Sequence, residues 1–264
     1  MDLQLSGKTA FITGSTSGIG FATAKLLLQE DVRVIINGRK KSSIVDAIER
    51  LKKLVPNGEV EGIATDFSNV EEVAALVDQL PHLDILINNL GIYTSQTFFE
   101  TTDENWQRQM EVNLMSGVRL SKYFLPKMLR ENWGRIIFIS SECASLVPED
   151  LIAYSATKAA ILALSRGLSQ LTSGTEVTVN TLIPGSTLTE GAEQFLTNVA
   201  QKENKTKEEV EGDFFKKVRT SSLLQRFASV EEVANTITYY ASPLSAATNG
   251  AAIKIEGGSM GGIV

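Results

Sequence analysis

Cysteine and histidine are scarce in this sequence, and their scarcity excludes several kinds of site. Among the 264 residues, Cys143 is the only cysteine and His82 is the only histidine. One thiol can form neither a disulfide within the chain nor a cysteine-based zinc site, and one imidazole cannot make a multi-histidine metal site. A Ser-His-Asp triad would depend on His82 alone, and no G-x-S-x-G elbow is present. We therefore expect no metal centre and disfavour a serine hydrolase.

Long apolar runs and an excess of positive charge are also missing. No stretch reaches the roughly 18 consecutive apolar residues of a membrane span, and the first eight residues lack the pattern of a signal peptide. The 25 basic residues are outnumbered by 31 acidic ones, which gives a net charge of −6. Nucleic acids and anionic membranes both require a basic face. We expect a cytoplasmic globular protein that binds neither.

Short β-branched runs alternate with longer amphipathic runs along the chain. The predicted strands cover 8–13, 32–36, 59–64, 84–88, 135–140, 177–183 and 251–255. The predicted helices cover 19–30, 40–53, 69–79, 103–130, 151–172 and 229–241. This alternation implies parallel strands joined by helical crossovers, with helices on both faces of the sheet. Because no Pro-, Gly- or Ser-rich linker divides the chain, we expect one doubly wound α/β domain over residues 1–264.

A densely charged segment at about 189–220 breaks the alternation. Its apolar residues could form one buried stripe, which favours a helical insertion. Two interpretations remain open. The insertion is a solvated helix pair packed on the surface, or it is a lid over a pocket at the carboxyl ends of the strands, where open α/β sheets bind ligands.

A glycine loop follows the first predicted strand and leads into a helix. It reads Thr-Gly-Ser-Thr-Ser-Gly-Ile-Gly over 13–20. Gly14 would form the turn, Gly18 would let a phosphate approach beside Ile19, and Gly20 would allow helix and strand to pack closely. The N-terminus of the helix offers free N–H groups and a positive dipole to an anion. The spacing differs from the commoner G-x-G-x-x-G, but its context favours a dinucleotide site over an ordinary turn.

The second strand ends beside Arg39 and carries no acidic residue at that end. In a dinucleotide site, an acid there binds the ribose 2′-hydroxyl of NAD, whereas an arginine accommodates the 2′-phosphate of NADP. A guanidinium–phosphate bond is worth about 1.5–3 kcal/mol. Ser15 and Ser17 could assist. We therefore expect NADP(H) to be preferred over NAD(H), with a solvated basic turn as the alternative interpretation.

Tyr154 and Lys158 lie four residues apart on a predicted helix and so share one face. A tyrosine with a pKa near 10 needs a stabilised phenolate to exchange protons at neutral pH, and a neighbouring ammonium favours the charged form. Tyr123 and Lys127 repeat the spacing but lie in mid-helix, so we interpret Tyr123 as a packing residue. By contrast, Tyr154 follows Ser141 at the end of the fifth strand, where a hydroxyl could hold a carbonyl while the tyrosine protonates it.

Together, these residues resemble those of the classical short-chain dehydrogenases/reductases, and the resemblance extends over essentially the whole chain. The matching elements are the loop 13–20, Asp66, Asn88-Asn89-x-Gly91, Asn113, Ser141, Tyr154-x3-Lys158, Pro184-Gly185 and Gly257-Gly258. The resemblance implies a Rossmann sheet of seven parallel strands in the order 3-2-1-4-5-6-7 that binds a nicotinamide cofactor. Within the family, the chain looks most like the bacterial 3-oxoacyl-[acyl-carrier-protein] reductases.

The resemblance also implies a role for each site residue. Tyr154 is the general acid/base, Ser141 polarises the substrate oxygen, Lys158 lowers the pKa of the tyrosine and binds the nicotinamide ribose, and Asn113 holds a water in the proton relay. The residues that would contact the cofactor are Asp66 and Phe67 at adenine, Asn89 and Gly91 at the adjoining ribose, Thr189 at the carboxamide, and Pro184, Gly185 and Thr187 nearby. Relatives are usually tetramers that pair the helices at 103–130 and 151–172, so we expect a homotetramer or a homodimer.

Three departures from the family pattern bear on function. Leu90 replaces the usual alanine of the Asn-Asn-Ala-Gly turn, Ser17 stands where NADP-using relatives often have a basic residue, and the segment 189–220 is long and charged. An acidic carrier protein would require a basic docking face, which a net charge of −6 does not favour. A small free carbonyl or alcohol is therefore at least as good a substrate as an acyl carrier.

The leading functional hypothesis is an NADP-dependent reductase of a ketone or a 3-oxoacyl group. One alternative is an NAD-dependent alcohol or sugar dehydrogenase. Another is a regulator that senses the cofactor on the same fold without catalysis, although a sensor would not need the set of Asn113, Ser141, Tyr154 and Lys158.

Overall fold

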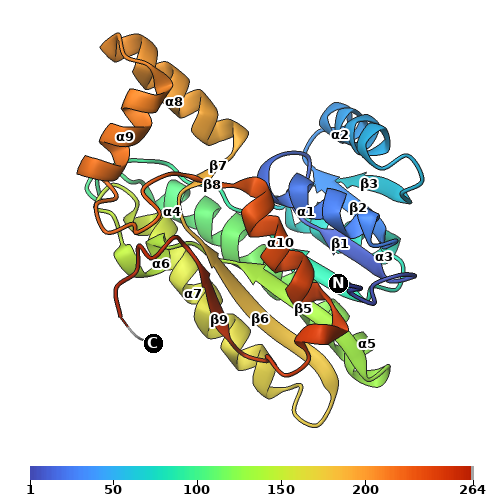
Figure 1. Cartoon of the computed structure of the whole chain (residues 1–264). Coiled ribbons are helices and arrows are strands. Elements are labelled where there is room, and N and C mark those ends of the chain that lie inside the picture. Colours follow the sequence, from blue (N-terminus) through green and yellow to red (C-terminus); the bar gives the residue numbers. More distant parts are fainter. Residues whose placement is uncertain (263–264) are drawn as a thin grey trace.

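Seven parallel strands form the centre of the molecule in a computed structural model that describes residues 1–262 (Figure 1). The strands are β1 (Thr9–Ile12), β2 (Arg33–Gly38), β3 (Val60–Ala64), β4 (Ile85–Asn88), β5 (Trp133–Ile139), β6 (Glu176–Pro184) and β9 (Ala252–Ile255). Their order in the sheet is β3-β2-β1-β4-β5-β6-β9. This confirms the predicted order, with β9 as the seventh strand.

Helices cover both faces of the sheet. They are α1 (Gly18–Gln29), α2 (Lys41–Leu54), α3 (Val70–Gln79), α4 (Asp103–Met110), α5 (Ser116–Arg130), α6 (Cys143–Leu146), α7 (Ile152–Gln170) and α10 (Val230–Ala241), followed by the short turn η2 (Pro243–Ser245). Side chains of α1, α2 and α10 pack with Ile12 in one core, whereas those of α3, α5 and α7 pack with Phe11 in the other. Because successive strand residues point to opposite faces, strands covered on both faces read as continuous apolar runs.

The predicted single helix over 103–130 is interrupted. A π-helical turn, η1 (Glu111–Met115), separates α4 from α5 and carries Asn113. The stretch continues the helical pattern of its neighbours, so the sequence could not reveal a change in hydrogen-bond register. Isolated π-turns of this kind occur frequently at functional sites.

The segment 189–220 forms the expected helical insertion. It contains α8 (Glu190–Glu203) and α9 (Lys207–Lys217), and a small parallel ribbon of β7 (Thr187–Leu188) and β8 (Ala228–Ser229) flanks it. In Figure 1, the two orange helices project beyond the edge of the main sheet. Leu196, Ala200, Val210, Phe215 and Phe227 form a buried core in this part of the molecule. Thr206 caps α9 through a capping box with Glu209.

Within residues 1–262, no helix is long and apolar enough to cross a membrane. The same residues contain no group of three or more His, Cys, Asp or Glu side chains arranged to hold a metal ion.

Candidate active site

The predicted site residues come together at the carboxyl edge of the sheet. The glycine loop follows β1, the turn 88–91 follows β4, and Ser141 follows β5, while Tyr154 and Lys158 lie on α7. Parallel strands all end at this edge, so residues far apart in the sequence become neighbours.

The glycine loop has the backbone that its sequence predicts. Gly14 and Gly18 adopt positive φ angles of 60° and 57°, a region that side chains disfavour. A Cβ on Gly20 would lie 2.6 Å from both Asn89 Nδ2 and Gly14 O, so only glycine fits there. The hydroxyl of Ser15 is buried within the turn, where it donates to Ile12 O at 2.7 Å. Ser17, in contrast, is exposed at the start of α1.

Thr13 and Asn89 tie the glycine loop to the turn after β4. Asn89 Nδ2 donates to Thr13 O and Gly14 O at 3.0 and 2.9 Å, and the Asn89 N–H donates to Thr13 Oγ1 at 2.9 Å. Leu90 also contacts the loop, because a Cβ on Gly14 would lie 3.1 Å from Leu90 Cδ2. The leucine that departs from the family pattern therefore packs against the turn of the glycine loop.

Lys158 is almost fully buried and is held by backbone oxygens. Its Nζ donates to Ile139 O at 2.9 Å and to Leu90 O at 3.1 Å. A Cβ on Gly91 would lie 3.2 Å from this Nζ, so glycine leaves room for the ammonium. Burial lowers the pKa of Lys158 to about 8. The lysine thereby joins α7 to the ends of β4 and β5.

Asn113 connects the same strand end to α7 by another path. Its Oδ1 accepts from the Ile92 N–H at 2.8 Å, and its Nδ2 donates to Ile92 O at 2.9 Å and to Thr157 Oγ1 at 3.0 Å. Thr157 in turn donates to Tyr154 O at 2.7 Å. The π-turn thus places the Asn113 amide between the segment after β4, at Ile92, and α7, at Thr157. The water that the resemblance assigns to Asn113 stays a prediction.

Ser141 and Tyr154 face each other across the site. Burial raises the pKa of the Tyr154 phenol above its usual value, and its hydrogen bond with the Ser141 hydroxyl offsets part of this effect. Lys158 Nζ lies 5.7 Å from the centre of the tyrosine ring. The lowering of this pKa by Lys158, which the resemblance implies, stays a prediction. Tyr93, which the sequence did not single out, lies with its ring 5.7 Å from that of Tyr154.

The adenine end of the predicted cofactor site lies at the ends of β2 and β3. Arg39 is exposed there. Hydrogen bonds from the Ser68 hydroxyl and N–H hold the pKa of Asp66 below its usual value, and the Arg39 guanidinium adds to this effect. Phe67 is buried in the core beneath α3. Its side chain is thus a packing group, and its contact with adenine stays a prediction.

The end of β6 brings the remaining predicted residues to the site. Gly185 has no room for a side chain, because a Cβ would lie 2.7 Å from Glu256 Cα. Thr187 donates to Gly185 O at 2.9 Å, and Thr189 caps α8. The first residue of α8, Glu190, reaches back to the glycine loop, where its Oε2 accepts from the Gly18 N–H at 2.8 Å.

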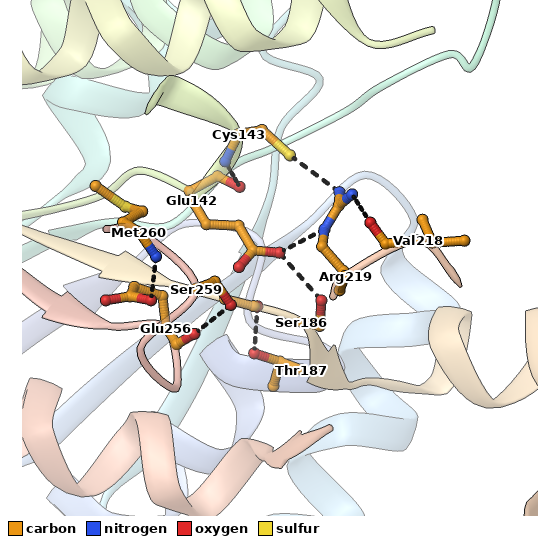
Figure 2. A network of polar contacts seen from close by, with 11 residues as sticks. Glu142, Cys143, Ser186, Thr187, Val218, Arg219, Glu256, Ser259 and Met260 are labelled. Carbon is orange, nitrogen blue, oxygen red and sulfur yellow. Dashed lines mark hydrogen bonds and ion pairs between the residues drawn. The ribbon is translucent and has the colours of Figure 1, made fainter. Parts of the chain in front are cut away.

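A buried ion pair that sequence reasoning missed lies beside Ser141. Figure 2 shows the Glu142 carboxylate between Arg219 and Ser186, with the Cys143 thiol on the side of the guanidinium. Arg219 Nε and Ser186 Oγ each donate to Glu142 Oε1 at 3.0 Å. The charged residue immediately after a strand-terminal serine was the one signal that could have pointed to this cluster.

Comparisons with known proteins identify relatives of similar sequence and fold. The family described as short chain dehydrogenase matches residues 8–200. YvrD, an uncharacterized oxidoreductase of Bacillus subtilis, is 46% identical over 261 residues that cover 98% of each chain. The 3-oxoacyl-[acyl-carrier-protein] reductase FabG of Aquifex aeolicus is 31% identical over 264 residues, covering 98% of this chain and 99% of FabG. L-sorbose reductase from Gluconobacter frateurii, solved with NADPH and L-sorbose, has a TM-score of 0.93 and 30% identity over 100% of both chains.

Proposed function

The chain belongs to the short-chain dehydrogenase family and is an NAD(P)-dependent oxidoreductase, and on that premise we propose that it reduces a carbonyl group with NADPH. The observation that carries this proposal is that Ser141, after β5, and Tyr154, on α7, lie together at the carboxyl edge of the sheet, with Lys158 and Asn113 beside them. A carbonyl oxygen placed between the two hydroxyls would accept a hydrogen bond from Ser141 and a proton from Tyr154.

The chain's own residues have distinct tasks in this reaction. Ser141 orients the carbonyl and stabilises the charge that develops on its oxygen. Tyr154 transfers the proton from its phenol to the substrate oxygen as negative charge develops there. Lys158 and Asn113 hold α7 at its distance from the strand ends. The nicotinamide, when bound, supplies the hydride to the carbonyl carbon.

The residues at the glycine loop fit a dinucleotide phosphate. Gly14 and Gly18 have the positive φ angles that bring backbone N–H groups close to an anion, and the loop opens onto the N-terminus of α1. The exposed Arg39 has no acidic neighbour in the sequence at the end of β2, which favours NADP(H) over NAD(H). The L-sorbose reductase structure holds NADPH, and the names of that protein and of FabG both describe carbonyl reduction.

Replacement of Tyr154 tests the proposed chemistry. Tyr154→Phe should lower kcat at least about a hundredfold, because proton transfer by a positioned group is worth that much, while the Kd for NADPH measured by cofactor fluorescence stays within about twofold. Tyr123→Phe is the matched control, because Tyr123 has the same spacing to a lysine but packs on α5 under Lys127. If the Tyr154→Phe enzyme kept most of its kcat, the assignment of Tyr154 would be wrong.

Titration with NADPH and NADH tests the cofactor preference. We expect NADPH to bind about ten times more tightly or better, and Arg39→Asp to reverse the preference. An unchanged ratio in Arg39→Asp would mean that Arg39 does not contact the 2′-phosphate, and the substrate screen would then begin with alcohols and sugars. We also propose a homotetramer that pairs the faces of α5 and α7, which sedimentation equilibrium would test.

A further inference from the structure

Arg219 lies where the helical insertion returns to the body of the molecule, beside the catalytic serine. It follows α9, and its backbone N–H donates to Phe214 O at 3.0 Å. Its Nη2 lies 3.9 Å from Cys143 Sγ, and the N–H of Cys143 donates to Ser141 Oγ at 3.2 Å. The guanidinium therefore reaches the same short segment that presents the Ser141 hydroxyl to a substrate (Figure 2).

Glu142 holds this guanidinium in a single orientation. Its side chain is 4% exposed, and its Oε1 accepts from Arg219 Nε at 3.0 Å and from Ser186 Oγ at 3.0 Å. A buried carboxylate requires such partners, since an unpaired charge would be costly. These contacts join the segment after β5, the segment after β6 and the end of the insertion. Arg219 is therefore positioned by Glu142, which has no part in the proposed proton transfer.

The terminal nitrogens of Arg219 have much weaker partners than its Nε. Their recorded contacts within residues 1–262 are Cys143 Sγ at 3.9 Å and Val218 O at 3.5 Å, both at the outer limit for a hydrogen bond. A guanidinium has five N–H donors, and its two terminal nitrogens match the two oxygens of a carboxylate. The side chain is 15% exposed. Arg219 is thus oriented by one carboxylate and retains donors for a second.

We propose that Arg219 binds a carboxylate group of the substrate and that Glu142 positions it for this task. The inference rests on the proposed carbonyl reduction and names its substrate class. The substrate is a small oxo acid, whose carbonyl oxygen lies between Ser141 and Tyr154 while its carboxylate reaches Arg219. A free acid also fits an enzyme with a net charge of −6 better than an acidic carrier protein does, because one local cation suffices to bind it.

Matched acids and esters test this substrate class. We would measure NADPH oxidation with 3-oxobutanoate, 4-oxopentanoate and 5-oxohexanoate and with the methyl ester of each, so that charge is the main difference within a pair. The native enzyme should show a kcat/KM about tenfold or more higher for the acid than for the ester at one chain length at least. A lack of preference at every chain length would overturn the proposal.

Variants of Arg219 separate binding from a merely structural role. Arg219→Gln should lower kcat/KM for the preferred acid about ten- to hundredfold, mainly through KM, and change that of the ester less than about threefold. Arg219→Lys should recover part of the loss because it restores the charge without the planar fork. Arg226→Gln is the control, since Arg226 pairs with Glu232 at the surface. Equal losses for acid and ester would show that Arg219 only supports the fold.

Two further measurements keep the result interpretable. The variant Glu142→Gln/Arg219→Gln removes both charges together and so avoids an unpaired buried carboxylate; it should repeat the selective loss for the acid. Calorimetry with hexanoate and hexanamide, in the presence of saturating NADP⁺, measures carboxylate binding without turnover. Arg219-dependent binding of hexanoate alone, with no NADPH oxidation by any ketone, would uphold the carboxylate site and refute carbonyl reduction. Turnover of acids and esters at equal rates would uphold carbonyl reduction and refute the carboxylate site.

Discussion

The glycine loop and the helical insertion both border the site, but they are stabilised in different ways. The loop is held by the main body, because Asn89 donates to Thr13 O and Gly14 O and leaves no space for a side chain on Gly20. The insertion packs its aromatic residues against Phe227, which follows it in the chain, and the rings of Phe214 and Phe227 stack with centres 5.2 Å apart. We therefore expect the loop to share the stability of the sheet and the insertion to open as a separate packing unit.

Removal of an aromatic ring from the insertion should have the largest effect. Phe215 is 2% exposed and packs edge-on against Phe214 and Phe227. Phe215→Ala should cost about 3–5 kcal/mol of local stability, because it leaves a cavity in a core with few members. Hydrogen exchange should show faster exchange in α8 and α9, while amides of β1, β4 and β5 keep their protection.

Phe99→Ala provides the control, because Phe99 is 96% exposed and should change exchange nowhere. If Phe215→Ala accelerated exchange in the sheet as much as in α8, the insertion and the sheet would form one cooperative unit. The proposed difference in stability between the glycine loop and the insertion would then be wrong.

A methyl group in the glycine loop should have the next largest effect. Gly20→Ala places a Cβ against Asn89 Nδ2 and Gly14 O, so the loop must shift, at a cost of about 1–3 kcal/mol in the free energy of unfolding. We also expect it to abolish NADPH binding in fluorescence titrations. Gly212→Ala is the matched change in α9, where the Cβ would meet nothing within 4 Å. It should instead stabilise that helix by up to about 1 kcal/mol. A Gly20→Ala protein that bound NADPH normally would show that the loop adapts.

A different contrast, between local and tertiary determinants, separates what the sequence could predict from what it could not. The glycine loop follows from local rules, since a turn with positive φ angles and a helix N-terminus are properties of neighbouring residues. The strand order followed from a family resemblance, and the convergence of Ser141 with Tyr154 followed from the ends of parallel strands. These features do not depend on the exact packing of distant side chains.

The features that sequence reasoning missed depend on distant side chains. Glu142 and Arg219 are 77 residues apart, and no pattern in the charged segment distinguishes Arg219 from the basic residues around it. The raised pKa of Tyr154 reflects burial by several elements, which its spacing to Lys158 cannot express. The π-turn at Asn113 likewise depends on the tertiary contacts of the amide with Ile92 and Thr157.

The smallest expected effect concerns the hydrogen bond that joins the two regions. Glu190 Oε2 accepts from the Gly18 N–H at 2.8 Å, where it occupies the end of α1 that would receive the phosphates of the dinucleotide. Glu190→Gln removes a negative charge beside that anion site, so the Kd for NADPH should fall about two- to fivefold, and the gain should shrink at high salt. Glu193→Gln, in the same first turn of α8, is the control.

Either direction of change in Glu190→Gln is informative about the comparison. Tighter binding, with a gain that shrinks at high salt, means that the charge of the Glu190 carboxylate opposes the cofactor phosphates. Weaker binding would contradict this expectation. It would mean that Glu190 supports the glycine loop when the cofactor is bound, so that the first turn of α8 belongs to the cofactor site.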